Sequence, residues 1–382
     1  LSSSPAPITR YVGSAAAFRV GTGGALPMTY KWFKGATPIP GATNDTLWLS
    51  NVQIADDAST YYAEVKNQWN TTNSETAALT VTDRLVPVPI TGYAKVVTRD
   101  GPMGYWRLDE AEGSTIAVDA VGSFDGTYDS NGAGVYTPGI FTFDAPTGIP
   151  HETNVAVVVT NGARVVIPYA LELNSYGAFA AEAWVKPTTL SVDSADYRTV
   201  FSSQGSGVGG PIGWLLYQQP DHTFAWVLFA DNWISSFMGI SGTIVANNWY
   251  HLVLQYDGAQ FNAYVNGVLA GSQVYPGFIP NRNGEINLGW RRDNDWKPFA
   301  GTIDDVAFYN KALTPEQIQT HYNATVRLSV TRSGNNVILS WPFGTLQQAN
   351  LATGTYSDMG AATSPYTNAV GVSPQYFRVK LQ

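Results

Sequence analysis

The chain of 382 residues contains no cysteine, which excludes disulfides, thiolate metal sites and cysteine nucleophiles. Only 13% of its residues are charged, the formal net charge is -8, and no basic run exceeds Arg291 and Arg292. A nucleic-acid backbone or an anionic membrane surface attracts a basic patch, so neither is an expected partner. No apolar run approaches the roughly 18 residues that a membrane helix needs, so membrane insertion is not expected either.

Signals for catalysis are also scarce. The chain has four histidines, and none stands in an H-x-H or H-E-x-x-H pattern that would indicate zinc or a histidine-based triad. Glycoside hydrolases need two carboxylates about 5 to 10 Å apart, usually as acids alternating on one strand. Glu182 stands alone in its strand, on the face of Trp184. We therefore expect no catalytic residue.

Aromatic residues are plentiful at 13% of the chain, and short β-like runs alternate with turn signals. In residues 1–83 these runs recur about every ten residues, which is typical of a β-sandwich. The stretch "YKWFKGATPIPGATNDTLWLSNVQIADDASTYYAEVKN" resembles a bacterial immunoglobulin-like domain. The resemblance implies that Trp32 is the core tryptophan and Tyr61 the tyrosine-corner residue. Val20 and Ala63 stand where the family has its two cysteines.

Residues 84–95, with Pro87 and Pro89, are expected to form an extended linker. Residues 96–323 then carry many strand-like segments and one short helix candidate, "TPEQIQTHYN", which predicts a two-sheet jelly roll. "MGYWRLDE", "FAAEAWVKP", "NNWYHLVLQYDGAQFNAYVNGVLAG", "INLGW" and "FAGTIDDVAFYNKALTPEQI" resemble, in this order, the laminin-G-like or concanavalin-A-like jelly-roll family. The resemblance implies that Glu182 is a structural acid and that His251 is a buried, hydrogen-bonded strand residue.

Residues 324–382 change character and predict a small C-terminal β-sandwich-like module. The pieces "LSWPFGTLQQA", "SPY" and "YFRVKL" resemble a carboxy-terminal module of exported bacterial proteins. The expected fold is thus all-β, with an immunoglobulin-like sandwich, a concanavalin-A-like jelly roll and this module in series.

Two adjacent acids, Asp304 and Asp305, interrupt an apolar strand near the end of the jelly roll. The resemblance implies that the first and last strands of this domain are neighbours and that one structural calcium ion binds near their edge. Its expected ligands are Asp109, Asp119 and Asp304, because Ca²⁺ prefers several oxygen ligands. The alternative is that Asp304 caps backbone amides while Asp305, on the opposite face by strand alternation, is solvated.

One loop combines aromatic and planar polar side chains, the two kinds of group that bind sugars. The alternative is ordinary loop packing with Arg–Asp pairs. The candidate ligand-binding residues are Trp290, Arg291, Arg292, Asp293, Asp295 and Trp296, together with Trp233 from another loop.

These features favour a non-catalytic, extracellular or cell-surface protein that binds a glycan or another surface ligand through its jelly roll, for carbohydrate binding or adhesion. A chain that starts at Leu1 rather than Met fits a secreted protein after signal removal. One alternative is a structural subunit that self-associates into a filament, matrix or surface layer. Another is the accessory region of a larger polysaccharide-degrading enzyme.

Overall fold

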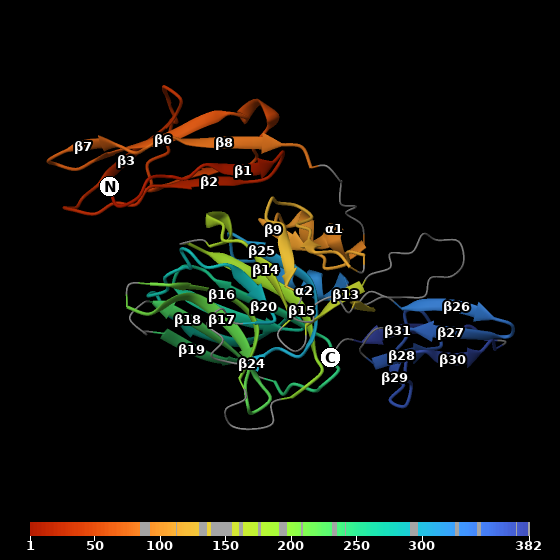
Figure 1. Cartoon of the computed structure of the whole chain (residues 1–382). Coiled ribbons are helices and arrows are strands. Elements are labelled where there is room, and N and C mark those ends of the chain that lie inside the picture. Colours follow the sequence, from red (N-terminus) through yellow and green to blue (C-terminus); the bar gives the residue numbers. More distant parts are fainter. Residues whose placement is uncertain are drawn as a thin grey trace.

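The computed structural model is nearly all-β, with 49% strand and 7% helix. It contains several sandwich sheets, so the expected fold class is confirmed (Figure 1). The structure describes residues 1–84, 92–111, 113–129, 136–138, 155–159, 163–174, 177–190, 197–207, 209–230, 235–240, 242–290, 297–324, 328–341, 345–371 and 373–380.

The N-terminal sandwich packs a six-stranded sheet against a strand pair. The sheet has the order β1-β8-β6-β3-β4, with β7 on β6, and the pair is β2-β5. The bounds are β1 (Ile8–Tyr11), β2 (Ala16–Arg19), β3 (Thr29–Lys34), β4 (Thr37–Pro38), β5 (Thr46–Leu49), a 3-10 turn η1 (Ile54–Asp56), β6 (Ser59–Lys66), β7 (Thr71–Asn73) and β8 (Ala77–Thr82).

The core of this sandwich contains the residues that the sequence assigned to it. Trp32, Tyr61, Val20 and Ala63 are all buried in one cluster, and the Trp32 indole donates to the carbonyl oxygen of Asn44 at 2.9 Å. Aliphatic volume therefore fills the space between the two layers without a disulfide.

The jelly roll consists of two large sheets. In the described residues, the eight-stranded sheet has the order β12-β13-β25-β15-β20-β21-β22, with β9 on β25. Its bounds are β9 (Gly104–Trp106), β12 (Tyr136–Pro138), β13 (Val155–Val159), β15 (Phe179–Pro187), β20 (Tyr250–Tyr256), β21 (Gln260–Val265), β22 (Val268–Val274) and β25 (Gly301–Tyr309).

The nine-stranded sheet, counted over the same described residues, has the order β10-β11-β14-β23-β16-β17-β18-β19, with β24 on β16. Its bounds are β10 (Ile116–Ala117), β11 (Gly126–Asp129), β14 (Arg164–Ile167), β16 (Arg198–Ser206), β17 (Pro211–Gln218), β18 (Phe224–Ala230), β19 (Ser235–Ile240), β23 (Ile286–Leu288) and β24 (Lys297–Pro298). A second 3-10 turn, η2 (Leu171–Leu173), follows β14.

Strand alternation explains how the two sheets share one core. In β17, Trp214 and Leu216 belong to the main core, whereas Leu215 and Tyr217 belong to a separate cluster on the outer face. Side chains two apart on a strand share a face, so this pattern places the main core between the sheets.

Two helices cover the outer face of the eight-stranded sheet. Helix α1 (Gly92–Arg99) and helix α2 (Pro315–Ala324) both contribute to an outer cluster that includes Trp184 of β15. Thr314 caps α2 reciprocally, since its hydroxyl accepts from the Gln317 N–H and its own N–H donates to the Gln317 side chain. The helix in "TPEQIQTHYN" is therefore confirmed, while α1 occupies part of the segment expected to be an extended linker.

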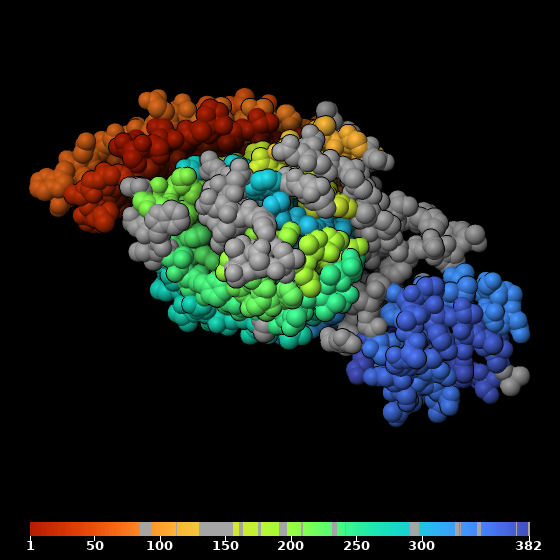
Figure 2. All heavy atoms as spheres, turned by 60° about the horizontal axis from the view of Figure 1, so that its bottom comes forward, coloured from red at the N-terminus to blue at the C-terminus, as the bar shows by residue number. Residues whose placement is uncertain are grey.

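The C-terminal residues form two three-stranded sheets, β26-β27-β30 and β29-β28-β31, in the described part of this region. Figures 1 and 2 show this blue module at one end of the jelly roll, whereas the red and orange N-terminal residues lie along its side. The bounds are β26 (Ser329–Ser333), β27 (Asn336–Ser340), β28 (Thr345–Ala349), β29 (Ser357–Asp358), β30 (Tyr366–Ala369) and β31 (Tyr376–Lys380).

Candidate functional site

One row of side chains crosses the outer face of the nine-stranded sheet. Cα partners in an antiparallel sheet carry their side chains on the same face. Ile286 and Leu288 belong to the main core, so Asn287 between them faces outward. The register then places these outward residues in one row: Val166, Asn287, Ser202, Leu215, Val227 and Phe237.

Asn287 is the unusual member of this row. It is fully buried, and neither Nδ2 nor Oδ1 of its amide has a hydrogen-bond partner among the described residues. Leaving a buried polar group unpaired costs about 1–3 kcal/mol. An amide offers a donor and an acceptor side by side, which matches neighbouring hydroxyl groups of a ligand. The Asn287 amide is therefore a candidate ligand contact.

The chain turns at Gly289, between Leu288 and Trp290. The φ angle of Gly289 is +89°, and a Cβ at this position would lie 3.0 Å from the Val159 side chain, so glycine is required. The Gly289 N–H donates to the Val200 carbonyl oxygen at 2.6 Å, and the Ser202 hydroxyl donates to the Trp290 carbonyl oxygen at 3.2 Å. These bonds hold Gly289 and Trp290 against β16.

The Trp290 side chain adds an aromatic ring and a donor near Arg164, which lies two residues before Val166 on β14 and so shares its face. Its Nε1 atom is buried without a hydrogen-bond partner in the described part of the chain. The guanidinium carbon of Arg164 lies 5.9 Å from the ring centroid, and Arg164 is itself paired with Asp129 at 2.9 Å. We refer to Asn287, Ser202, Trp290 and Arg164 as the sheet-face site.

The sequence prediction of a ligand-binding loop is only partly open to comparison. Trp290 lies in the sheet-face site, as described. The other predicted residues lie outside the described residues: Trp233, Arg291, Arg292, Asp293, Asp295 and Trp296. Their binding role stays a prediction.

Sequence reasoning missed Asn287 and Ser202. The signal was present in "INLGW", where two buried aliphatic residues flank one asparagine. Alternation alone sends that asparagine to the face opposite the core. The absence of partners for its amide is a property of the folded chain that no sequence pattern reports.

The expected neighbourhood of the first and last jelly-roll strands is confirmed, because β9 pairs with β25. Asp119 lies next to them as the bridge partner of Trp106. It is fully buried and accepts four backbone N–H groups, from Tyr105, Val121 and Gly122 at one oxygen and from Phe124 at the other. Asp119 therefore holds the loop that follows it.

The other two predicted metal ligands have separate surroundings. Asp109 pairs with Arg107 at 2.8 Å. Asp304 lies opposite Trp184, and its charge partly offsets the burial that lowers the pKa of Lys186. Within the described residues, no group of three His, Cys, Asp or Glu side chains could hold a metal ion. Calcium binding through Asp109, Asp119 and Asp304 stays a prediction.

The expectation that Asp305 is solvated on the opposite face is wrong. Glu182 lies opposite Ala307 and Trp184 opposite Asp304, so two steps along β15 face three steps along β25. This β-bulge interrupts the alternation, with Asp305 at a φ of 48°. Asp305 is buried and accepts a hydrogen bond from the Tyr105 hydroxyl, and burial raises its pKa to about 7.

Glu182 is the centre of a buried polar network beneath α1 and α2. It accepts from the hydroxyls of Tyr93 at 2.9 Å and Tyr309 at 3.1 Å. Its carboxylate also lies 2.8 Å from Nε2 of His251 and 2.9 Å from Nδ1 of His321. The structural interpretation of Glu182 and His251 fits this geometry, while the part played by His321 was not foreseen.

The charges in this network support one another. Burial alone would raise the pKa of Glu182, but the charge and hydrogen bonds of the two histidines outweigh it and hold that pKa well below its usual range. Burial alone would lower the pKa of His321, yet Glu182 and Asp100 together raise it. Asp100 lies 2.9 Å from Nε2 of His321 and also accepts from Gln317. The network thereby ties both helices to the sheet.

Among the described residues, neither helix reaches the length and apolar character that a membrane span would require.

Residues 159–319 match the family model described as the concanavalin A-like lectin/glucanases superfamily (Laminin_G_3). This part of the chain is therefore a concanavalin A-like jelly roll. The match does not extend to residues 1–83 or 324–382, so the immunoglobulin-like domain, the C-terminal module and the exact domain boundaries stay predictions.

No curated protein sequence matches the chain significantly. Among solved structures, the chain is similar to the botulinum neurotoxin serotype D binding domain, with 14% identity and a TM-score of 0.45 over 68% of this chain and 69% of that one. It is also similar to domain 4 of an extracellular arabinanase from Geobacillus stearothermophilus in complex with arabinotriose. That match has 21% identity and a TM-score of 0.37, over 57% of this chain and 97% of that domain.

Proposed function

We propose that the chain is a non-catalytic, extracellular carbohydrate-binding protein, and that its jelly roll holds a glycan at the sheet-face site. The observation that carries this proposal is the buried Asn287 amide, whose donor and acceptor both lack partners among the described residues. The buried N–H of Trp290, which also lacks a partner among the described residues, offers a further donor. A sugar supplies hydroxyls for these groups and C–H faces for the indole ring.

The composition of the sheet supports binding over hydrolysis. The six strands β14, β16, β17, β18, β19 and β23 contain no Asp or Glu. A hydrolase of the usual kind needs a carboxylate pair flanking the scissile bond. The family name includes both lectins and glucanases, and these strands favour the first of the two.

Access to the site has a kinetic consequence. Asn287 has no solvent exposure, so a glycan reaches its amide only after the groups above it move aside. Binding that requires such a change is slower than docking to a preformed surface.

A glycan array probed with the full chain, followed by calorimetry on the best ligand, tests this proposal. We expect Asn287→Leu and Trp290→Ala each to weaken binding tenfold or more, because each removes a contact worth about 1–3 kcal/mol. Phe237→Ala is the matched control, since Phe237 ends the same row, is 49% exposed and should leave affinity unchanged. An empty array, or affinity unaffected by both site variants, would refute the proposal.

One observation favours the alternative of a self-associating structural subunit. Strand β22 is the last strand of the eight-stranded sheet in the described residues, and Val268, Leu269 and Val274 on it are each more than half exposed. An apolar edge strand can pair with another chain. Light scattering over a range of concentrations separates the two functions, because polymer formation without any glycan would favour the subunit.

A further inference from the structure

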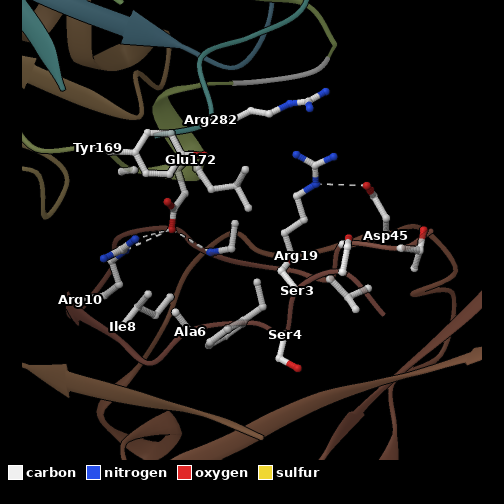
Figure 3. Close-up of a pocket in the computed structure, with 18 residues that line it drawn as sticks. Ser3, Ser4, Ala6, Ile8, Arg10, Arg19, Asp45, Tyr169, Glu172 and Arg282 are labelled. Carbon is white, nitrogen blue, oxygen red and sulfur yellow. Dashed lines mark hydrogen bonds and ion pairs between the residues drawn. The ribbon is translucent and has the colours of Figure 1, made fainter. Parts of the chain in front are cut away.

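Two neighbouring cavities lie between the N-terminal sandwich and the jelly roll, and the residues of the sheet-face site line neither of them. Their volumes are about 750 Å³ and 510 Å³, and Asp45 and Leu171 line both. Figure 3 shows the walls of the larger cavity, with Arg19 on the sandwich side and Tyr169 and Glu172 on the jelly-roll side. We propose that the two cavities form a second binding site, the boundary groove, and that it binds a neutral oligosaccharide.

The larger cavity contains a hydrogen-bond acceptor that the fold does not use. The Glu172 side chain in η2 is fully buried, and its Oε1 accepts from Arg10 Nε at 3.1 Å, from Arg10 Nη2 at 2.7 Å and from the Ala17 N–H at 2.7 Å. Its Oε2 has no hydrogen-bond partner among the described residues. A buried acceptor without a donor is unfavourable. A ligand hydroxyl that donates to Oε2 would remove this cost.

The charges of the lining favour a neutral ligand over an ion. Arg10 is paired with Glu172 at 2.7 Å. Arg19 meets Asp45 at 3.1 Å, and Arg282 also has an interaction of its own. An anion would be repelled by the unpaired oxygen of Glu172, whereas a cation would enter a wall with three guanidinium groups. A neutral hydroxyl donates to the oxygen without either repulsion.

Each cavity also has an exposed aromatic ring in its lining. Tyr169 lines the larger cavity and is 36% exposed, while Trp48 on β5 lines the smaller one and is 40% exposed. Leu47 belongs to the core of the sandwich, so alternation turns the neighbouring Trp48 away from that core. Aromatic rings of this kind stack on the C–H faces of sugars. Further hydroxyl and amide groups in the two linings come from Ser2, Ser3, Ser4, Thr22, Thr43, Asn44 and Thr46.

Other contacts along the boundary hold the two walls of the groove in place. The Tyr11 N–H donates to the Ser123 hydroxyl at 2.6 Å, and the Arg84 side chain donates to the Gly122 carbonyl oxygen. Fixed walls lower the ordering cost of binding. The Glu172 side chain has no solvent exposure, so a neighbouring side chain has to rotate before a ligand hydroxyl reaches Oε2.

Calorimetry on the full chain with three neutral trisaccharides, maltotriose, cellotriose and xylotriose, tests the boundary groove. We expect at least one of them to bind, and the anionic tri-galacturonate to bind at least tenfold more weakly. Trp48→Ala should weaken binding of the neutral sugar at least tenfold, because it removes a stacking surface. Trp69→Ala is the matched control, since Trp69 is a 78% exposed tryptophan of the same sandwich and lines neither cavity.

Two further variants test the larger cavity. Glu172→Gln keeps Oε1 as the acceptor for Arg10 and replaces Oε2 by an amide donor, so it should weaken binding at least tenfold. Ala6→Trp leaves Glu172 intact and fills part of the cavity, because Ala6 is an exposed lining residue. Its control is Thr9→Trp, at an exposed neighbour outside the lining, which should leave affinity unchanged. Thermal unfolding of each variant shows whether the fold is retained.

Four outcomes would overturn the proposal. They are the absence of binding for all three neutral sugars at millimolar concentration, tri-galacturonate affinity equal to theirs, affinity that Trp48→Ala and Ala6→Trp leave unchanged, and equal losses in these variants and their controls. Asn287→Leu separates the boundary groove from the sheet-face site. Affinity that falls with Asn287→Leu and not with Trp48→Ala would place the sugar on the sheet face and eliminate the groove, whereas the reverse would support the groove alone.

Discussion

Two buried polar residues on opposite outer faces of the jelly roll, Glu182 and Asn287, differ in how many of their hydrogen bonds are made. Beneath α1 and α2, both carboxylate oxygens of Glu182 are engaged, by two tyrosines and two histidines. On the nine-stranded sheet, the amide of Asn287 is equally buried and has no partner in the described residues. The two side chains are equally buried, and they differ in the use of their hydrogen-bonding capacity.

The difference in hydrogen bonding between Glu182 and Asn287 indicates different roles for the two residues. A buried polar group with all its partners contributes to a specific fold, whereas one without partners costs stability until something else supplies them. By this criterion Glu182 stabilises the architecture, whereas Asn287 fits the glycan contact that we propose. The comparison predicts that substitutions at the two positions change stability in opposite directions.

The largest expected effect is at Glu182. Replacing it in Glu182→Ala leaves His321 and His251 without their shared carboxylate and opens a cavity under both helices. We expect the free energy of unfolding to fall by about 3–5 kcal/mol, the usual cost of removing one partner from a buried ion pair. Urea unfolding followed by tryptophan fluorescence measures this. A loss below 1 kcal/mol would mean that the network does not secure the helices.

A smaller effect is expected at Asp305. Its pKa is raised from 3.8 to about 7 by burial, despite the hydrogen bond from Tyr105 and the charge of Arg107. A raised pKa in the folded state means that folding favours the protonated Asp305 carboxyl. The stability that this protonated carboxyl contributes is complete below pH 3.8, its ordinary pKa, and is lost as the pH rises through about 7, its pKa in the folded state. Asp305→Asn stays neutral, keeps the acceptor for Tyr105 and tolerates the positive φ.

We therefore expect Asp305→Asn to match the unchanged protein near pH 4 and to exceed its stability at pH 8 by about 2–4 kcal/mol. Unfolding curves at the two pH values measure the difference. The exposed Asp83 provides the control, Asp83→Asn, which should show no such pH-dependent gain. A gain at pH 4 as large as at pH 8 would rule out titration of Asp305 as the cause.

The smallest change in stability, and of opposite sign to that at Glu182, is expected at Asn287. Asn287→Leu replaces a buried unpaired amide by an apolar side chain of similar size, so the free energy of unfolding should stay constant or rise by about 1 kcal/mol. The same variant should lose glycan binding. A marked loss of stability would show that the amide has partners and would remove the distinction between the two faces.

Much of the fold could be predicted from local pattern. Turn spacing and alternation indicated the sandwich and the jelly roll, and the stretch "TPEQIQTHYN" indicated helix α2. Strand alternation failed at Asp304 and Asp305, because a β-bulge inserts one extra residue in a stretch that reads as a regular strand. A bulge depends on the register with β15, more than 100 residues earlier in the chain.

The candidate site could likewise be predicted only in part from the sequence. Trp290 was named as a candidate because its loop combines aromatic and planar polar side chains. The outward direction of Asn287 was missed, although alternation in "INLGW" would have given it. The partners of Glu182 come from positions 93, 251, 309 and 321, so their meeting depends on the whole topology. Glu172 bonds to Arg10 and Ala17, which lie more than 150 positions earlier in the chain, and no local sequence pattern predicts such contacts.

The hydrogen bonds of Glu172 to Arg10 and Ala17 also determine how the N-terminal sandwich lies against the jelly roll. Because three donors of the N-terminal sandwich converge on one carboxylate of the jelly roll, the angle between the two parts is fixed by side-chain chemistry and not by the chain that joins them. Lengthening the sequence between Asp83 and Gly92 would then leave the angle unchanged, and the two parts would tumble in solution as a single body.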